Sequence, residues 1–132
     1  MYLLDTNAVS DIIRNPLGAV ARRMAAVADL PIATSIIVAA ELRFGAEWKG
    51  SQRLFAKLES TLRRVPALPL GEGADVHYAH LRVDLQRRGC PIGASDMWIA
   101  AHALSLGATL VTDKTREFER VEGLAIENWL RD

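Results

Sequence analysis

Three carboxylates occupy positions in the sequence where a negative charge is costly. Asp5 directly follows the apolar segment Tyr2-Leu3-Leu4, and Glu41 lies in the run Ile-Ile-Val-Ala-Ala-Glu-Leu, which has no other charge. Asp96 lies near the start of a further apolar segment, in Ser-Asp-Met-Trp-Ile-Ala-Ala. A buried carboxylate without a partner tends to take up a proton. If the three side chains converge, their repulsion requires a cation, and a hard divalent ion with oxygen ligands suits them.

Magnesium held by a few carboxylates supports the hydrolysis of phosphodiester bonds. The ion stabilises the charge that builds up on the phosphate and lowers the pKa of a bound water, which makes hydroxide available near neutral pH. A carboxylate then acts as a base or orients that water. Each acid also has a purely structural explanation. Asp5 would cap a helix, Asp96 would complement a helix dipole in the first turn, and Glu41 would pair with an arginine or reach solvent.

The histidines do not indicate a zinc site instead. His77 and His80 fall on one helix, no second pair follows them, and His102 stands alone. Zinc sites need three or four such ligands at converging positions. The sequence therefore favours Mg²⁺ over zinc, with Asp5, Glu41 and Asp96 as its candidate ligands.

The segments around these acids alternate between short apolar strands and helices. Strands are expected at residues 2–4, 31–34, 108–112 and 124–126, with an extended segment at 65–70. Helices are expected at residues 8–14, 17–27, 36–44, 52–62, 73–88 and 94–106, with a bend or loose packing at Gly45. This alternation predicts βαβ units and a three-layer α/β/α sandwich with a mainly parallel central sheet. In such sheets the ligand site lies beyond the carboxyl ends of the strands.

Length and charge set the remaining limits. A chain of 132 residues predicts one domain, residues 1–132, and its sixteen basic and sixteen acidic residues cancel. Nothing global therefore attracts the protein to nucleic acid. Six basic residues do gather between positions 43 and 64. They form either a solvated helix face or a rim that contacts phosphates, and the sequence leaves both readings open.

The chain is expected in the cytoplasm. Its single cysteine, Cys90, cannot form an internal disulfide, which fits a reducing compartment. The N-terminus has neither the basic region nor the apolar core of a signal peptide, and no apolar run approaches the ~18 residues of a membrane span.

The order and spacing of several motifs resemble the PIN-domain family and, more narrowly, the VapC toxins of bacterial VapBC toxin–antitoxin modules. The similarity covers nearly the whole chain. The motifs are Leu4-Asp5-Thr6-Asn7, Thr34-Ser35 with Ala40-Glu41-Leu42 and Gly45, Ile92-Gly93 with Asp96 and Ile99-Ala100-Ala101, Leu110-Val111-Thr112, and Arg116 to Val121 with Trp129. Any one of them alone is weak, but four in the same order are specific.

The resemblance implies a fold, an activity and partners. Members of the family have an α/β/α sandwich and are Mg²⁺- or Mn²⁺-dependent endoribonucleases. They are commonly homodimers, and a small antitoxin encoded alongside neutralises them by lying across the toxin's groove. Asp5, Glu41 and Asp96 match the three acids of the family's active site. Toxins similar to this subgroup cut initiator transfer RNA, and others cut ribosomal RNA, so transfer RNA is the favoured substrate.

One position departs from the family. A fourth acid or an Asn usually stands two residues after the threonine at the strand end, where this chain has Lys114, with Asp113 one place earlier. Asp113 is therefore kept as a further metal ligand to be tested. Side chains alternate along a strand, so a strand continuing through Lys114 would turn Asp113 to the other face. The expected core is three carboxylates, with Lys114 either facing the groove or merely solvated.

Other functions fit less well. A phosphatase with an aspartyl nucleophile would need a second Asp two residues after Asp5, where this chain has Asn7. A receiver-like signalling domain would need paired acids at the end of the first strand. The remaining alternative is an inactive module of the same fold that binds RNA or an antitoxin. Cleavage of RNA with and without a chelator distinguishes it from an enzyme.

Overall fold

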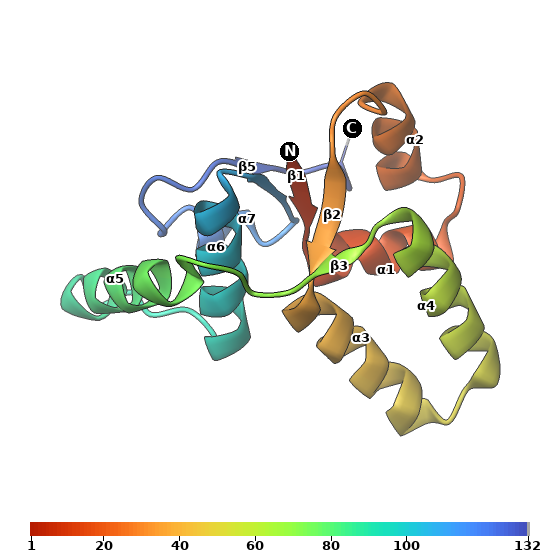
Figure 1. The fold of residues 1–132 in the computed structure, drawn as a ribbon, viewed down its shortest axis with the longest axis horizontal. Helices are drawn as coiled ribbons and strands as arrows, with labels where there is room; N and C mark the ends of the chain where they lie inside the picture. Colours follow the sequence, from red (N-terminus) through yellow and green to blue (C-terminus); the bar gives the residue numbers. More distant parts are fainter. Residues whose placement is uncertain (132) are drawn as a thin grey trace.

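A single parallel sheet organises the molecule. The computed structural model describes residues 1–131, so the last residue of the expected 1–132 domain lies outside the described part (Figure 1). The sheet order is β3-β2-β1-β4-β5, and every pair is parallel. The strands are β1 (Tyr2–Leu4), β2 (Ile32–Ser35), β3 (Ala67–Leu68), β4 (Thr109–Val111) and β5 (Ile126–Glu127).

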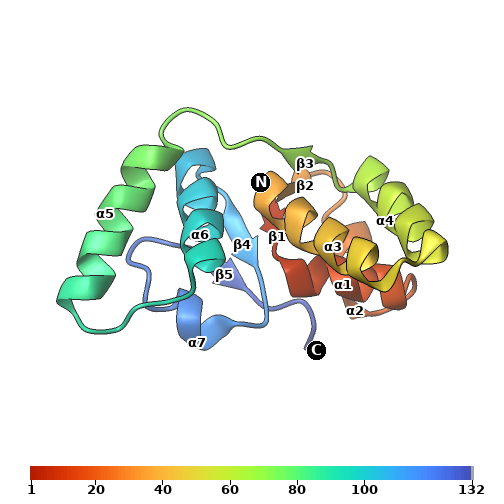
Figure 2. The same ribbon diagram turned by 90° about the horizontal axis from the view of Figure 1, so that it is seen from below.

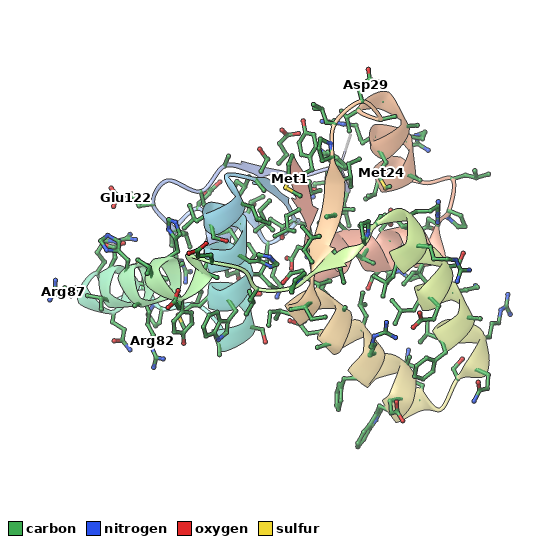
Figure 3. The ribbon with its side chains drawn as sticks, in the orientation of Figure 1. Met1, Met24, Asp29, Arg82, Arg87 and Glu122 are labelled. Carbon is green, nitrogen blue, oxygen red and sulfur yellow. The ribbon has the colours of Figure 1, made fainter. Side chains whose placement is uncertain are left out.

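Helices cover the sheet and confirm the expected α/β/α sandwich. They are α1 (Thr6–Arg14), α2 (Ala19–Ala26), α3 (Ile36–Lys49), α4 (Gln52–Arg64), α5 (Ala74–Arg87), α6 (Ala94–Leu106) and α7 (Thr115–Phe118). In both Figure 1 and Figure 2, α1 to α4 gather on the right and α5 to α7 on the left, with β1 between them. Helix α5 packs on α6 and extends outward, so that Arg82 and Arg87 project from it at the edge of the molecule (Figure 3).

The central position of β1 explains its apolar sequence. It pairs with β2 on one side and with β4 on the other. Leu3 and Leu4 of β1 and Leu110 and Val111 of β4 are fully buried. A parallel strand covered on both faces reads as a continuous apolar run, as these do. The first polar residue after β1, Asp5, therefore stands at the edge of the core.

Two expectations about helices need correction. Of the bend or loose packing expected at Gly45, the bend is wrong, because α3 runs unbroken to Lys49 and ends at Gly50, whose φ is 61°. A Cβ added to Gly45 would meet nothing within 4 Å, so neither a bend nor a close approach requires the glycine there. Its helix cost of about 1 kcal/mol is small against the packing of α3. The short helix α7 was not predicted.

The described residues contain no candidate membrane-spanning helix. None of the helices within residues 1–131 combines the length and the apolar character that crossing a membrane requires.

Candidate active site

Asp5 stands at the carboxyl end of β1 and begins α1. Its backbone amide donates to the carbonyl of Val111 over 2.9 Å, which continues the ladder to β4. Oδ1 accepts a hydrogen bond from the amide of Thr6 at 2.8 Å, so that Asp5 is the N-cap of α1. Oδ2 accepts from the hydroxyl of Thr112 at 2.8 Å. One oxygen is thus fixed by the helix and the other by the residue after β4.

The surroundings of Asp5 disfavour its charged form. The side chain is 1% exposed. Burial raises the pKa of the Asp5 carboxyl, the hydrogen bonds from Thr112 and Thr6 oppose the rise, and the negative charge of Asp96 adds to it. A cation placed nearby would relieve both the desolvation and the repulsion.

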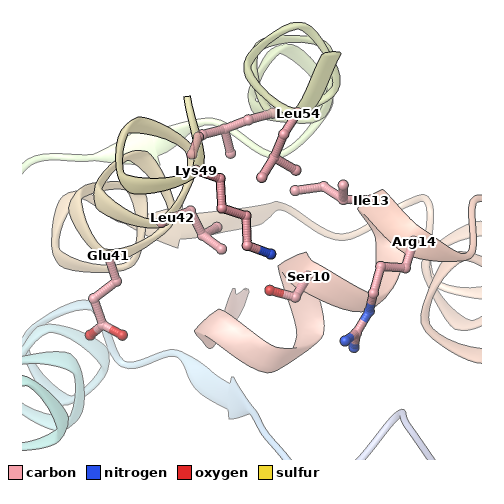
Figure 4. A pocket seen from close by; sticks show the side chains of 10 residues that line it. Ser10, Ile13, Arg14, Glu41, Leu42, Lys49 and Leu54 are labelled. Carbon is pink, nitrogen blue, oxygen red and sulfur yellow. The ribbon is translucent and has the colours of Figure 1, made fainter. Parts of the chain in front are cut away.

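Glu41 reaches the same region from α3, the helix that follows β2. Ser35, the last residue of β2, caps α3 by accepting from the amide of Ile37 at 3.1 Å. Glu41 follows in the second turn of α3, and its Oε2 accepts from the hydroxyl of Thr6 at 3.1 Å. Its Oε1 is buried and has no hydrogen-bond partner within the described residues. Figure 4 shows the carboxylate pointing away from Leu54 and toward α6.

Asp96 comes from the first turn of α6 and meets Lys114. The Lys114 Nζ lies 3.4 Å from Oδ2 and 3.5 Å from Oδ1 of Asp96. Burial by itself lowers the pKa of Lys114, but attraction from Asp96, Asp5 and Glu41 outweighs it, and the net shift is upward. All three sequence-predicted acids therefore lie close enough to act on one ammonium group.

Asp113 has a different partner. Its carboxylate accepts from the side-chain amide of Asn7, and its backbone amide donates back to the Asn7 Oδ1 over 3.4 Å. The strand β4 ends at Val111 and does not continue through Lys114. The exposed Asp113 side chain is thus tied to the first turn of α1.

A known protein family matches most of the chain. The PIN domain model matches residues 2–124 of the chain. The chain belongs to the PIN-domain family. This PIN domain is 36% identical to the tRNA(fMet)-specific endonuclease VapC of Shigella flexneri over 97% of each chain, and 35% identical to Ribonuclease VapC2 of Rickettsia felis over 98% of each. The expected resemblance to VapC proteins is confirmed.

Solved structures with similar folds are toxin–antitoxin complexes. VapBC2 from Rickettsia felis, bound to a DNA fragment from its promoter, matches with a TM-score of 0.88 and 32% identity, covering 97% of this chain and 98% of that one. VapBC-1 from nontypeable Haemophilus influenzae matches with a TM-score of 0.85 and 36% identity over 97% of each chain.

The oxygen donors of this PIN domain fit a hard cation, although Lys114 takes part in the cluster. As the side chains stand, no three His, Cys, Asp or Glu residues within positions 1–131 are close enough together to hold an ion. The buried, unpartnered Oε1 of Glu41 is nevertheless an oxygen that lacks a donor or a cation. Carboxylate oxygens alone suit Mg²⁺ or Mn²⁺.

A groove of about 270 Å³ runs beside Glu41 between α1, α3 and α4. Arg14 and Lys49 line it together with Ile13 and Leu54 (Figure 4). Lys49 thus places one member of the basic run in the groove that Glu41 also lines. Arg43 of the same run pairs instead with Glu59 of α4.

Sequence reasoning missed the polar residues that hold these acids. Thr6 and Thr112 donate to Glu41 and Asp5, and the only sequence signal was their place beside an acid or a strand end. His102, expected to be isolated, is fully buried, and its Nδ1 lies 2.8 Å from the Ser35 Oγ. No local pattern predicts that contact, because the two residues are far apart in the chain.

Proposed function

We propose that this PIN domain is the toxin of a type II toxin–antitoxin module. It acts as a metal-dependent endoribonuclease that hydrolyses phosphodiester bonds in RNA, with transfer RNA as the favoured substrate, and a cognate antitoxin inhibits it. The observation that carries the proposal is the placement of Asp5, Glu41 and Asp96 at the carboxyl edge of a PIN-fold sheet. Thr6 contacts both Asp5 and Glu41, and Lys114, which contacts Asp96, is bonded through Thr112 to Asp5.

The chain's own residues would hold the metal and orient the reacting groups. Asp5, Glu41 and Asp96 are the proposed ligands, with Mg²⁺ preferred and Mn²⁺ as a substitute. When bound, the ion stabilises negative charge on the phosphate and makes hydroxide available from water. Thr112 and Thr6 hold the Asp5 and Glu41 carboxylates in place. The unpartnered Oε1 of Glu41 would be left to bind the ion or to orient water.

Asp113 is proposed as a support and not as a ligand. Asn7 donates to one oxygen of the Asp113 carboxylate and accepts from its backbone amide, which joins the segment after β4 to α1. This choice keeps the metal core at three carboxylates.

The substrate and partners are inferred from the relatives. The Shigella flexneri protein is named a tRNA(fMet)-specific endonuclease, which favours transfer RNA here. Arg14 and Lys49 supply positive charge beside Glu41 for a phosphate backbone. The neighbours solved as VapBC complexes support an antitoxin partner for this chain. We further propose that the protein is a homodimer and that it acts in the cytoplasm. Light scattering on the purified protein tests the oligomeric state.

The decisive experiment is cleavage of transfer RNA by purified protein in Mg²⁺ and in excess chelator. Asp96→Asn is expected to abolish cleavage with the fold intact. Asp75→Asn is the matched control, because Asp75 is likewise a first-turn acid, on the adjacent helix α5. Cleavage that persists in chelator, or in Asp96→Asn, contradicts the proposal. Binding of RNA without any cleavage indicates an inactive binding module.

A further inference from the structure

Lys114 brings a positive charge into the carboxylate cluster of Asp5, Glu41 and Asp96. Its Nζ lies within 3.5 Å of both oxygens of Asp96. Asp5 and Glu41 attract the same ammonium from a longer range. The cluster is therefore not made of acids alone.

The backbone of Lys114 is fixed at this place by Thr112, which also fixes Asp5, and by Phe118. Its amide donates to the Thr112 Oγ1 over 3.0 Å, and that hydroxyl donates to Asp5. Its carbonyl accepts from the amide of the fully buried Phe118 at 3.2 Å, which anchors the start of α7. The position of the lysine is thus built into the site.

The net formal charge of the cluster limits the number of divalent cations that it can bind. Three carboxylates and one ammonium carry a formal charge of minus two, which one divalent cation balances. A second divalent ion would be placed next to an existing positive charge. Like charges a few Å apart repel even under surface screening.

We propose that Lys114 is a resident cation of the carboxylate cluster, whose ammonium takes the place of a second divalent ion so that the site holds one ion only. This inference rests on the proposed metal-dependent function and specifies its metal content. The side chain of Lys114 is 48% exposed, so the ammonium also remains accessible to a phosphate oxygen of bound RNA. An ammonium can stabilise charge on a phosphate as a point charge.

The test compares Mn²⁺ binding to the wild-type protein, Lys114→Met and Lys114→Asn, followed by electron paramagnetic resonance and calorimetry without RNA. Lys114→Met removes the charge with little change in length, and Lys114→Asn also supplies an oxygen ligand. Lys57→Met is the matched control, because it removes the same charge from an exposed residue of α4. Circular dichroism of each variant verifies its fold.

The wild-type protein is expected to bind one Mn²⁺ per chain. Lys114→Met should bind its first Mn²⁺ at least about tenfold more tightly than the wild type, Lys114→Asn should take up a second ion, and Lys57→Met should match the wild type. Two ions in the wild type, or equal Mn²⁺ affinity in Lys114→Met and Lys57→Met, would overturn the inference.

A parallel cleavage assay of the wild type in Mn²⁺ and in chelator keeps the two proposals apart. Cleavage that depends on Mn²⁺, together with unaltered binding in Lys114→Met, rejects the role of Lys114 and leaves the nuclease in place. Absence of Mn²⁺ binding and of metal-dependent cleavage in the wild type rejects the proposed function and, with it, the single-ion site.

Discussion

His102 of α6 and Ser35 at the end of β2 are joined in the core, with the Nδ1 of the imidazole 2.8 Å from the Oγ of the serine. His102 lies six positions after Asp96 on α6, and Ser35, which caps α3, lies six positions before Glu41 on that helix. The contact therefore ties together two of the helices that form the site.

Breaking this contact should cost stability and alter the site. His102→Ala leaves a cavity in the core and is expected to lower the free energy of unfolding by about 2–4 kcal/mol. Ser35→Ala, which also removes the α3 cap, should cost about 1 kcal/mol. His102→Asn, whose side chain can still bond Ser35, should recover part of the loss and of the cleavage rate. Denaturant unfolding measures the first effect, and additive losses in the double variant would contradict the coupling.

Stability should fall in weak acid because of the same histidine. Burial lowers the pKa of His102, and the carbonyl of Pro69 opposes this shift without reversing it. A folded pKa below the ordinary 6.5 means that folding favours the neutral ring. The stabilisation is fully present above pH 6.5 and is lost as the pH falls from there toward the folded value. The Tm of the wild type should therefore fall toward that of His102→Asn as the pH decreases over this range. A difference in Tm that does not change with pH would count against this role of the histidine.

Asp5→Asn should stabilise the protein in chelator at neutral pH. The pKa of Asp5 is raised above its ordinary 3.8, mainly by burial, so the folded state favours the neutral carboxyl. That contribution is present at low pH and is lost as the pH rises through the folded pKa. Asn keeps the acceptor for the Thr6 amide, and its own amide group can donate to Thr112. A Tm above that of the wild type at neutral pH, with the gap closing in acid, is the expected result; a lower Tm at neutral pH would be contrary to it.

Asp96→Asn should behave differently in the same measurement. Relief of carboxylate repulsion alone predicts a slight stabilisation of the metal-free protein. The contact with Lys114 opposes this, because the variant also loses the attraction to the ammonium. The pair is partly exposed, so the two effects should nearly cancel and leave the free energy of unfolding in chelator within about 0.5 kcal/mol of the wild-type value. Mg²⁺ should raise the Tm of the wild type and not that of the variant.

Asp113→Asn should retain substantial cleavage activity. The Asn7 side chain can still bond an amide at position 113, so the join between α1 and the segment after β4 survives. Cleavage rates of Asp113→Asn and Asp96→Asn, measured in the same assay, test this prediction directly. A loss as complete as that of Asp96→Asn would mean that Asp113 is a full ligand.

Much of this protein was determined by local sequence patterns. The alternation of apolar runs with helical segments predicted the parallel sheet, because strands covered on both faces need continuous apolar residues. Helix α6 follows its predicted bounds, Ala94 to Leu106, since a glycine ends it and apolar residues fill it. The prediction of Asp5 beyond a strand end held because its polarity interrupts an apolar run. The role of the three acids as ligands remains a prediction.

Only the tertiary structure decided how the acids are held and what faces them. Glu41 and Thr6 are thirty-five positions apart, and Asp5 and Thr112 are 107 apart. Their hydrogen bonds depend on the pairing of β1 with β2 and β4, which no local pattern encodes. Lys114 illustrates the same limit. Alternation along a strand determined the face only as long as the strand lasted, and β4 ends at Val111. Beyond that residue, the hydroxyl of Thr112 and the start of α7 set the direction of the chain and brought the ammonium to Asp96.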